Sequence, residues 1–363
     1  MCKTILFVGG GTLGHISPAV PVIKELKKRN PNYKIYFIST NKKTEKDYIK
    51  KNIGKYLNGF FYFDVMGFKR KVYKLESIKY NLLSLKKYIK NKKGIKKKLN
   101  EIKPDLVIGM GGYISAMLIK KVKKENTKII IHEQNAFMGL ANKMIRKKAD
   151  KILTAFPIKE KKEKYRKKEK LVYNPSINET LVYKNKGFEK ENTVLVISGS
   201  MGSSLINNLA IDTALVLKNY KFTIVCGKKY YNDNINKINC LKNEINFIPF
   251  SNDLLKLIKE NSIIVSRAGS STLFEILGLE KASILIPSSF VSDNHQYYNA
   301  KYLEEKKQAL LLLEEEASVN KLKELIVSLN ESFKLKNNII VNIKKDEYLS
   351  SLNKFIIEIE DIL

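Results

Sequence analysis

The chain has 363 residues, 44% of them hydrophobic and 28% charged, and a formal net charge of +31. This length exceeds what one hydrophobic core usually supports, so we expect two domains, and the composition excludes a disordered or collagen-like protein. The three cysteines are scattered without the Cys-x-x-Cys spacing of a zinc or redox site, which excludes a disulfide framework and favours a reducing cytoplasm.

Short β-branched and aromatic segments alternate with helical stretches twice along the chain, a pattern typical of parallel sheets covered by helices. In the first half the predicted strands are 4–8, 34–39, 60–65, 106–108, 128–132 and 151–154. In the second half they are 193–197, 222–225, 245–248, 263–265, 283–286 and 309–313. The sequence therefore predicts an α/β fold of two Rossmann-like domains facing a cleft, with ligands outside the carboxyl ends of the strands.

We place the first domain at residues 1–160, an exposed basic linker at 161–172 and the second domain at 173–345. The C-terminal segment 346–363 carries apolar residues at helical spacing and is expected to join the first domain. No signal peptide is predicted, and no segment has the roughly 20 mainly apolar residues that a membrane span needs.

A glycine-rich turn, Gly9 to His15, follows the first predicted strand and formally matches G-x-G-x-x-G. Such a turn lets backbone amides approach a phosphate or a sugar. A dinucleotide site would also need an acidic residue about 20 residues further on, at the end of the second strand, where the sequence has Ser39 to Lys43 instead. The Lys-Ser/Thr pair of a P-loop is absent as well. An NAD-dependent enzyme and a P-loop nucleotide hydrolase are therefore both disfavoured.

The whole excess of positive charge lies in residues 1–172 and is densest over 68–98. There, lysines such as Lys86, Lys87 and Lys90 alternate with apolar residues, which is typical of a helix lying on an anionic membrane surface. A solvated helix in a lysine-rich protein is the alternative. The charge also permits nucleic-acid binding, but no helix-turn-helix, zinc-finger or RNP signature is present, so we expect no nucleic-acid partner.

All three histidines fall at predicted ligand-binding edges: His15 ends the glycine turn, His132 ends the fifth strand and His295 begins a helix. A single loop histidine is more often structural, but three at such positions favour a functional site. No Asp-x-Asp motif or His/Asp cluster is present, so no metal cofactor is expected.

The second half has two strand-turn-helix segments of its own. Ser198 to Ser203 is expected to cradle a nucleotide diphosphate, or else to be a tight turn with an N-cap serine. In the second segment, Ser271 and Glu275 share a helix face, which places a carboxylate within reach of a ribose. Arg267 either counters phosphate charge or pairs with a neighbouring acid.

These segments in this order resemble the MurG family of UDP-N-acetylglucosamine transferases over nearly the whole chain. The resemblance is carried by Gly10-Gly11-Thr12, Gly14-His15, Gly109 to Ser115, His132-Glu133-Gln134-Asn135, Gly139 to Asn142, Asn174-Pro175, Ser266 to Gly269, His295-Gln296 and Asn299-Ala300. It implies a GT-B glycosyltransferase architecture and the inverting transfer of N-acetylglucosamine from UDP-N-acetylglucosamine to lipid I, the lipid-linked muramoyl-pentapeptide. The product would be lipid II in peptidoglycan synthesis, and the enzyme would be peripheral on the cytoplasmic face of the membrane.

The resemblance also implies roles for individual residues. His15 is expected to be the catalytic base, because an imidazole near a helix N-terminus favours its neutral form. On the donor side, Glu275 would bind the ribose, Ser200 the diphosphate, and Gln296 and Asn299 the sugar. The remaining residues expected to bind the donor are Thr12, Asn135, Arg267, Ala268 and Gly269. Those expected to bind the acceptor are Gly10, Gly11, Gly14, Gly111, Gly112, Tyr113 and His132.

The chain departs from the family pattern at four positions: Leu13 and Ser198 stand where the pattern has glycine, Met201 where it has glutamine, and Asn178 where an arginine often follows the Asn-Pro turn. The departures leave room for a different acceptor. A diacylglycerol glycosyltransferase or a UDP-sugar epimerase of the same fold is therefore kept as an alternative function.

Overall fold

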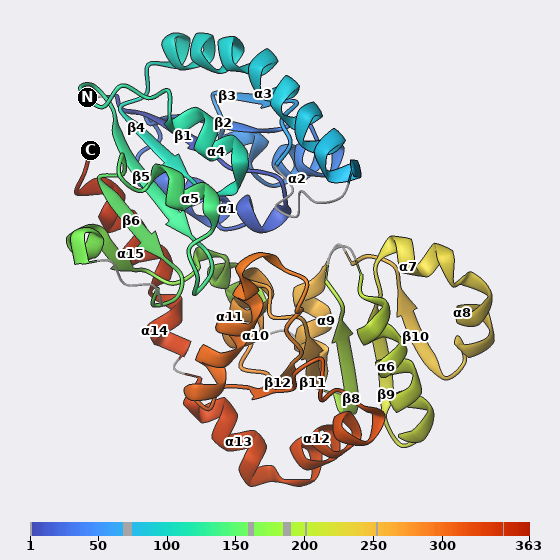
Figure 1. Cartoon of the computed structure of the whole chain (residues 1–363). Helices are drawn as coiled ribbons and strands as arrows, with labels where there is room; N and C mark the ends of the chain where they lie inside the picture. The colour runs from blue at the N-terminus through green and yellow to red at the C-terminus, as the bar shows by residue number, and fades with distance from the viewer. Residues whose placement is uncertain are drawn as a thin grey trace. The chain divides into compact units, whose positions relative to one another are not determined.

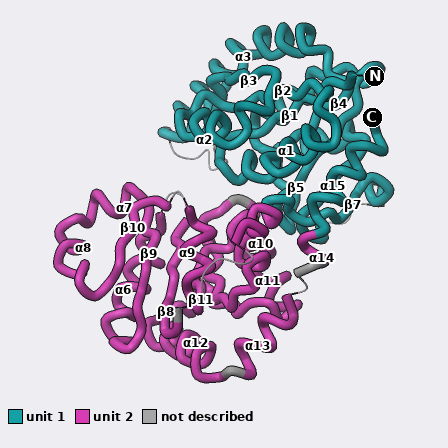
Figure 2. Tube along the Cα trace, turned by 180° about the vertical axis from the view of Figure 1, so that it is seen from behind, with its two compact units in different colours: residues 1–176, 350–363 teal, residues 177–349 magenta. Residues whose placement is uncertain are grey.

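The computed structural model of the chain describes residues 2–67, 75–158, 163–183, 190–199, 202–251, 253–343 and 345–363. It divides into two compact units (Figure 2). Unit 1 comprises Met1–Ser176 and Ser350–Leu363, and unit 2 comprises Ile177–Leu349. Each unit is built on its own parallel sheet.

Unit 1 is organised around a sheet in the order β3-β2-β1-β4-β5-β6-β7, and each neighbouring pair is parallel. Its strands are β1 (Thr4–Val8), β2 (Lys34–Thr40), β3 (Gly59–Phe63), β4 (Leu106–Gly109), β5 (Lys128–Glu133), β6 (Lys151–Thr154) and β7 (Glu169–Leu171). Side chains alternate between the two faces of each strand. In β1, Ile5 and Phe7 enter one core, while Leu6 and Val8 enter the other.

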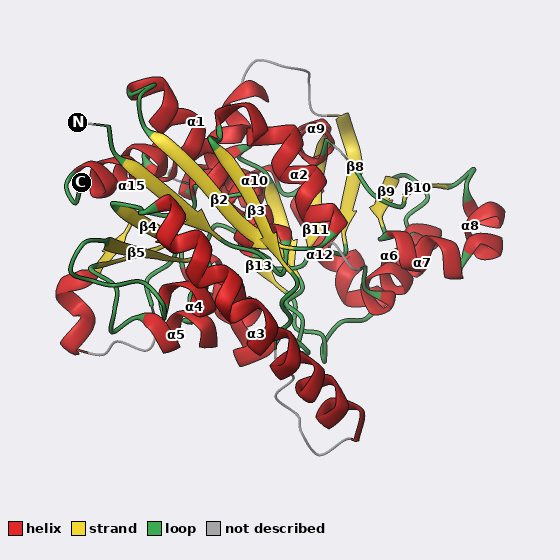
Figure 3. Cartoon of the chain, turned by 90° about the horizontal axis from the view of Figure 1, so that it is seen from above, coloured by secondary structure: helices red, strands yellow, loops and turns green. Residues whose placement is uncertain are grey.

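Helices cover both faces of this sheet (Figure 3). They are α1 (Ala19–Arg29), α2 (Lys43–Ile53), α3 (Leu75–Ile102), α4 (Gly112–Ile119), α5 (Leu140–Ile145) and α15 (Ser351–Glu360). Helices α1, α2 and α15 pack on the face of Ile5 and Phe7, and α3, α4 and α5 pack on the opposite face. Short 3₁₀ helices lie at Leu13–His15, Gly54–Tyr56 and Glu163–Lys168, and a longer one at Pro175–Tyr183.

The C-terminal helix α15 belongs to unit 1. Its residues Phe355, Ile356 and Ile359 are fully buried in the same core as α1. Ion pairs fix the polar side of the segment: Arg29 contacts Glu360 at 3.2 Å, and Lys151 contacts Glu358 at 2.7 Å. The apolar stripe of α15 therefore packs the C-terminal end of the chain against the sheet that contains the first strand.

The segment expected to be an exposed linker is partly structured in unit 1, which corrects that prediction. Strand β7 pairs with β6 at the edge of the sheet, and Tyr165 and Val172 on either side of it are buried. The side chains of β7 are mostly polar, because an edge strand contributes backbone hydrogen bonds rather than core residues. Such a strand resembles a loop in sequence.

Unit 2 has a sheet in the order β10-β9-β8-β11-β12-β13, again parallel throughout. Its strands are β8 (Lys190–Ile197), β9 (Lys221–Val225), β10 (Ile245–Ile248), β11 (Asn261–Ser266), β12 (Ala282–Leu285) and β13 (Leu310–Leu311). Its helices are α6 (Ser204–Val216), α7 (Lys228–Asp233), α8 (Ile235–Leu241), α9 (Leu254–Glu260), α10 (Ser270–Gly278), α11 (His295–Glu305), α12 (Val319–Glu331), α13 (Phe333–Asn342) and α14 (Lys345–Leu349), with a 3₁₀ turn at Ser292–Asn294.

Polar N-caps and two apolar cores position these helices. Ser203 accepts from the N–H of Ile206 at the start of α6, and Asp253 accepts from that of Lys256 at the start of α9. Helices α6, α12 and α13 cover one face of the sheet, and α9 and α10 cover the other. The predicted α/β fold with two parallel-sheet domains is confirmed. Within the described ranges, no helix is both long enough and apolar enough to cross a membrane.

Candidate active site

The predicted site residues fall into two groups, one at the carboxyl ends of the strands in each unit. In unit 1 the glycine turn leaves β1 and enters the 3₁₀ helix Leu13–His15, with exposed Thr12 as its N-cap residue. Gly11 has a φ of 98°, a conformation that favours glycine. Leu13 lies within the 3₁₀ helix and packs against the core, so the absence of glycine at this position causes no backbone strain.

Glu45, which the sequence analysis did not select, lies beneath this turn. Its side chain is buried and its oxygens accept from the N–H of Gly11 at 2.9 Å, from Ser39 Oγ at 3.0 Å and from Thr40 Oγ1 at 2.7 Å. The acid that is missing at the end of β2 is thus supplied by the first turn of α2. Because the N–H of Gly11 donates to Glu45, it stabilises the turn from within the protein rather than binding an anionic ligand.

Two further predicted residues, Gly111 and Gly112, lie beside the turn at the start of α4. Their φ angles are 101° and 80°. A Cβ on Gly111 would lie 2.5 Å from His15 Nδ1, and one on Gly112 would collide with the carbonyl oxygen of Gly10. Glycine is therefore needed at both positions for α4 to begin this close to His15.

His15 is joined to His132 through Gln134. His15 Nδ1 lies 3.2 Å from Gln134 Oε1, and Gln134 Nε2 lies 3.3 Å from His132 Nδ1. Gln134 Nε2 also donates to the carbonyl oxygen of Met110 at 2.5 Å. His132 is fully buried, and its burial lowers the pKa of the ring to about 3. A neutral, enclosed imidazole of this kind supports the site from below and is not positioned to contact a ligand.

Glu133 organises the loop that carries Asn135. Its carboxylate accepts from the backbone N–H of Asn135 at 3.1 Å, from that of Gly139 at 2.9 Å and from Asn142 Nδ2 at 2.9 Å. Burial raises the pKa of Glu133, and these hydrogen bonds partly offset the rise. Tyr113, on the first turn of α4, has its ring against Gly67.

In unit 2, the turn after β8 is shaped by two glycines, Gly199 with a φ of 92° and Gly202 with a φ of 76°. Ser198 stands where the family pattern has glycine, and its buried Oγ donates to the carbonyl oxygen of Val225 at 3.0 Å. This departure therefore adds a hydrogen bond between β8 and β9. Ser200, expected on the diphosphate, and Met201 lie outside the described residues.

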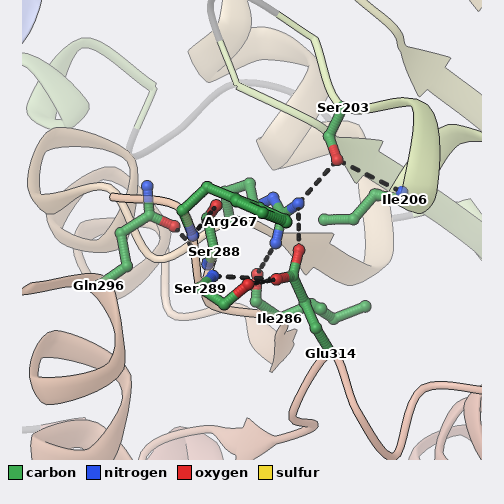
Figure 4. A network of polar contacts seen from close by, with 9 residues as sticks. Ser203, Ile206, Arg267, Ile286, Ser288, Ser289, Gln296 and Glu314 are labelled. Atoms are coloured by element: carbon green, nitrogen blue, oxygen red, sulfur yellow. Dashed lines mark hydrogen bonds and ion pairs between the residues drawn. The ribbon is translucent and has the colours of Figure 1, made fainter. Parts of the chain in front are cut away.

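Arg267 pairs with an acid of the chain (Figure 4). Its guanidinium contacts Glu314 Oε1 at 2.6 Å, donates to Ser203 Oγ at 2.7 Å and donates to the carbonyl oxygen of Ile286 at 3.1 Å. Glu314 Oε2 in turn accepts from Ser289. Burial would raise the pKa of Glu314, but the hydrogen bonds from Ser289 and Arg267 outweigh it and lower the pKa. Arg267 thus connects the segments that follow β8, β11, β12 and β13. Of its two predicted roles, this is the pairing with a neighbouring acid.

Glu275 and Ser271 lie on α10 as predicted, one turn apart. Glu275 Oε2 is buried and makes no hydrogen bond within the part of the chain that the structure describes. Burial, with a smaller contribution from Glu179, raises the pKa of Glu275 to about 7. An enclosed carboxylate oxygen without a donor is suited to accept from ligand hydroxyls.

The last donor-side residues lie near the turn that leads into α10. Asn299 is fully buried and its Nδ2 donates to the carbonyl oxygen of Ala268 at 3.1 Å, while Gly269 is the N-cap residue of α10. Gln296 Oε1 accepts from the N–H of Ser288 at 3.0 Å. The fourth departure, Asn178, donates to the carbonyl oxygen of Leu349 at 3.1 Å. Among the described residues, no group of three or more His, Cys, Asp or Glu is arranged to hold a metal ion.

Helix α3 (Figure 1) carries the part of the basic stretch that the structure describes. Ile78, Leu82, Leu85 and Ile89 form a stripe at helical spacing, and they are 46%, 61%, 45% and 60% exposed. Exposed Lys79, Lys86 and Lys90 run beside this stripe. Residues 68–74, which include four of the basic side chains in this stretch, lie outside the described residues.

The two parallel-sheet units, each with a glycine turn at its carboxyl edge, define the architecture of a two-domain nucleotide-sugar enzyme. Residues 5–154 match the glycosyltransferase family 28 N-terminal domain, and residues 193–347 match the family 28 C-terminal domain. The chain belongs to this family and, within it, to the MurG family.

Individual relatives agree with this assignment. The chain is 34% identical to the UDP-N-acetylglucosamine–N-acetylmuramyl-(pentapeptide) pyrophosphoryl-undecaprenol N-acetylglucosamine transferase of Bacillus subtilis, covering 90% of this chain and 91% of that protein. It is 35% identical to the enzyme of the same name from Caldicellulosiruptor saccharolyticus, over 90% and 89%.

Solved structures share the fold. The MurG crystal structure from Acinetobacter baumannii matches with a TM-score of 0.73 at 21% identity, covering 99% of this chain and 100% of that one. A putative UDP-N-acetylglucosamine 2-epimerase from Listeria monocytogenes matches with a TM-score of 0.72 at 9% identity, over 98% and 95%. Since both activities occur on this fold, the sequence relatives rather than the fold distinguish a transferase from an epimerase.

Proposed function

We propose that this chain transfers N-acetylglucosamine from UDP-N-acetylglucosamine to N-acetylmuramyl-(pentapeptide) pyrophosphoryl-undecaprenol. The observation that carries the proposal is the likeness, over nine-tenths of the chain, to curated enzymes named for this one reaction. Both domains of the chain take part in that likeness.

In the proposed reaction unit 2 binds the donor. The buried Oε2 of Glu275, which accepts no hydrogen bond from the described residues, supports a role in accepting from the ribose hydroxyls. Arg267, Ala268 and Gly269 would shape the adjoining turn, with Gln296 and Asn299 at its border. The amides of the turn after β8 would stabilise the departing diphosphate.

Unit 1 would bind the acceptor and supply the base. His15 would take the proton of the attacking hydroxyl as the oxygen bonds to the anomeric carbon of the sugar and UDP leaves with inversion. Of the proposed acceptor residues, Gly111 lies directly beside His15 Nδ1, and Gly112 lies against the backbone of Gly10 in the same turn, which supports placing the hydroxyl there. Gly14 and Tyr113 would border it, and Thr12 and Asn135 would approach the donor sugar.

The apolar and basic surface of α3 supports a peripheral association with an anionic membrane, where a lipid-linked acceptor resides. Aliphatic side chains would enter the headgroup region, and the neighbouring lysines would contact anionic lipids. We extend the proposal to the cytoplasmic face of the cell membrane, since a nucleotide-sugar donor is made in the cytoplasm.

Release of UDP tests the reaction. We expect release from UDP-N-acetylglucosamine only when the lipid-linked muramoyl-pentapeptide or a short-chain analogue is added. Release with diacylglycerol alone would instead assign a glycolipid acceptor, and conversion of the donor without any acceptor would indicate an epimerase. His15→Ala should lower kcat by at least about 100-fold with little change in donor affinity.

A further inference from the structure

Gln134 lies between two imidazoles, and its orientation is set by a third group. The carbonyl oxygen of Met110 can only accept, so the group 2.5 Å from it must be the amide nitrogen of Gln134. The other end of the same amide is then the oxygen, which faces His15 Nδ1 at 3.2 Å. The contact with Met110 thus fixes which end of the Gln134 amide is nitrogen and which is oxygen.

The amide oxygen of Gln134 has no proton to give. A neutral His15 must therefore carry its proton on Nδ1 to make this contact, and the ring lone pair then lies on Nε2. On the other side, the second N–H of the amide points to His132 Nδ1 at 3.3 Å, so Nδ1 of that buried ring accepts. The neutral His132 ring then carries its proton on Nε2.

The space around His15 favours this single arrangement. Gly111 leaves room for the ring, since a Cβ there would lie 2.5 Å from Nδ1 and 3.2 Å from Gln134 Oε1. Gln134 itself is 3% exposed, so water has little access to replace its oxygen. Both features keep the contact between His15 and Gln134 in place.

We propose that Gln134 is the positioning residue that holds the proton of His15 on Nδ1 and thereby presents the Nε2 lone pair as the proton acceptor. The catalytic part of this inference rests on the proposed function. The tautomers do not, because they follow from the contacts among His15, Gln134, His132 and Met110. The two histidines are expected to be opposite tautomers within one hydrogen-bonded chain.

Nitrogen-15 NMR of the full chain, labelled only at histidine, tests the proposal without an activity assay. The sequence has three histidines, so single substitutions assign every signal. At a pH where the imidazoles are neutral, we expect His15 to show a protonated Nδ1 and His132 a protonated Nε2. A protonated Nε2 on His15 in the unaltered protein would overturn the proposal, whatever the acceptor assay shows.

Gln134→Met provides the second arm, because methionine keeps the length of the side chain but removes both amide groups. We expect His15 to lose its single tautomer and kcat to fall about 10- to 100-fold, with the KM for UDP-N-acetylglucosamine nearly unchanged. Gln134→Glu keeps an acceptor for His15 when the carboxyl oxygen that faces the carbonyl of Met110 carries a proton, and in that form it should restore the Nδ1-protonated His15. An unchanged His15 tautomer in Gln134→Met would contradict the proposal.

Gln308→Met is the matched control. Gln308 is also 3% exposed, and its amide is hydrogen-bonded at both ends, to Asn342 and Tyr348, but it lies in unit 2. We expect Gln308→Met to leave the His15 tautomer unchanged. A shift of His15 in this control equal to that in Gln134→Met would assign the effect to general loosening and overturn the proposal.

Discussion

The backbone N–H of Gly11 donates to Oε1 of Glu45 at 2.9 Å, across 34 residues of sequence. The glycine turn is therefore held from below by a carboxylate of the chain, which also accepts from Ser39 and Thr40 at the end of β2. This contact changes the interpretation of the turn. One of its amides stabilises the fold, and the remainder of the turn positions His15.

Glu45→Ala should destabilise unit 1 by about 2–4 kcal/mol, because it leaves two buried donors and one partly buried donor without their acceptor. Chemical denaturation followed by circular dichroism measures the change. Glu25→Ala is the control, since Glu25 makes a partly exposed ion pair with Arg29, and we expect about 0.5 kcal/mol or less. Equal effects of the two substitutions would show that Glu45 does not hold the turn.

The Arg267–Glu314 pair should be strongly coupled. The two side chains are 10% and 9% exposed, so removing either one leaves a buried charge without its partner. We expect Arg267→Ala and Glu314→Ala each to destabilise unit 2 by about 3–5 kcal/mol, and the double variant by clearly less than their sum. Urea unfolding of all four proteins measures the coupling.

An exposed pair of the same length provides the control for this cycle. Lys218 and Glu244 also lie 2.6 Å apart, but their side chains are 65% and 47% exposed. The corresponding substitutions should each change the free energy of unfolding by about 1 kcal/mol or less, with little coupling. Additive effects at Arg267 and Glu314 would mean that their contact does not stabilise the unit.

The strands were predictable from sequence because the buried ones are rich in Ile, Val and Phe and are separated by turn residues. The predicted segments 4–8, 151–154 and 245–248 match β1, β6 and β10 at both ends. Strand β7 was not predicted, since its polar residues satisfy backbone hydrogen bonds without entering a core. The spacing of apolar residues in a sequence reveals buried strands, but it does not reveal a polar strand at the exposed edge of a sheet.

The site was predictable only in part, for a related reason. His15, Gly111 and His132 could be selected because glycines and histidines at strand ends are visible in sequence, although His132, predicted to bind the acceptor, is fully buried. Glu45 and Glu314 were not, because parallel pairing brings them to their partners from distant positions. The sequence could have suggested Glu45 as an acid in the first turn of the helix after Ser39 and Thr40. It could not show which way the Gln134 amide points.

Glu275 should make the stability of unit 2 depend on pH. Its pKa is raised to about 7, mainly by burial, from an ordinary value of 4.5, so folding favours the protonated form. The stabilisation is complete below about pH 4.5 and is lost as the pH rises through about 7, where the folded group must ionise. We expect the unliganded protein to lose about 1–3 kcal/mol over this range relative to Glu275→Gln.

Unfolding of both proteins at a series of pH values measures this difference. Addition of UDP should reduce it, because ribose hydroxyls would donate to the carboxylate and favour its ionised form. Glu280→Gln, two residues beyond the end of α10, is a control that should leave the pH dependence unchanged. Parallel pH curves for the unaltered protein and Glu275→Gln would remove Glu275 as the responsible group.

The stripe on α3 should determine binding to membranes. Replacement of Ile78, Leu82, Leu85 and Ile89 with Ser should weaken binding to vesicles of mixed anionic and zwitterionic lipid at least about 10-fold, because each exposed aliphatic side chain contributes burial in the interface. Replacement of Lys79, Lys86 and Lys90 with Glu should weaken binding to anionic vesicles and make it insensitive to salt. Co-sedimentation at two ionic strengths measures both effects.

The control carries Glu at Lys221, Lys242 and Lys323, which are exposed in unit 2 and give the same change in net charge. If this control loses as much affinity as the α3 lysine variant, the net charge of the chain, rather than the surface of α3, accounts for binding, and α3 is a solvated helix.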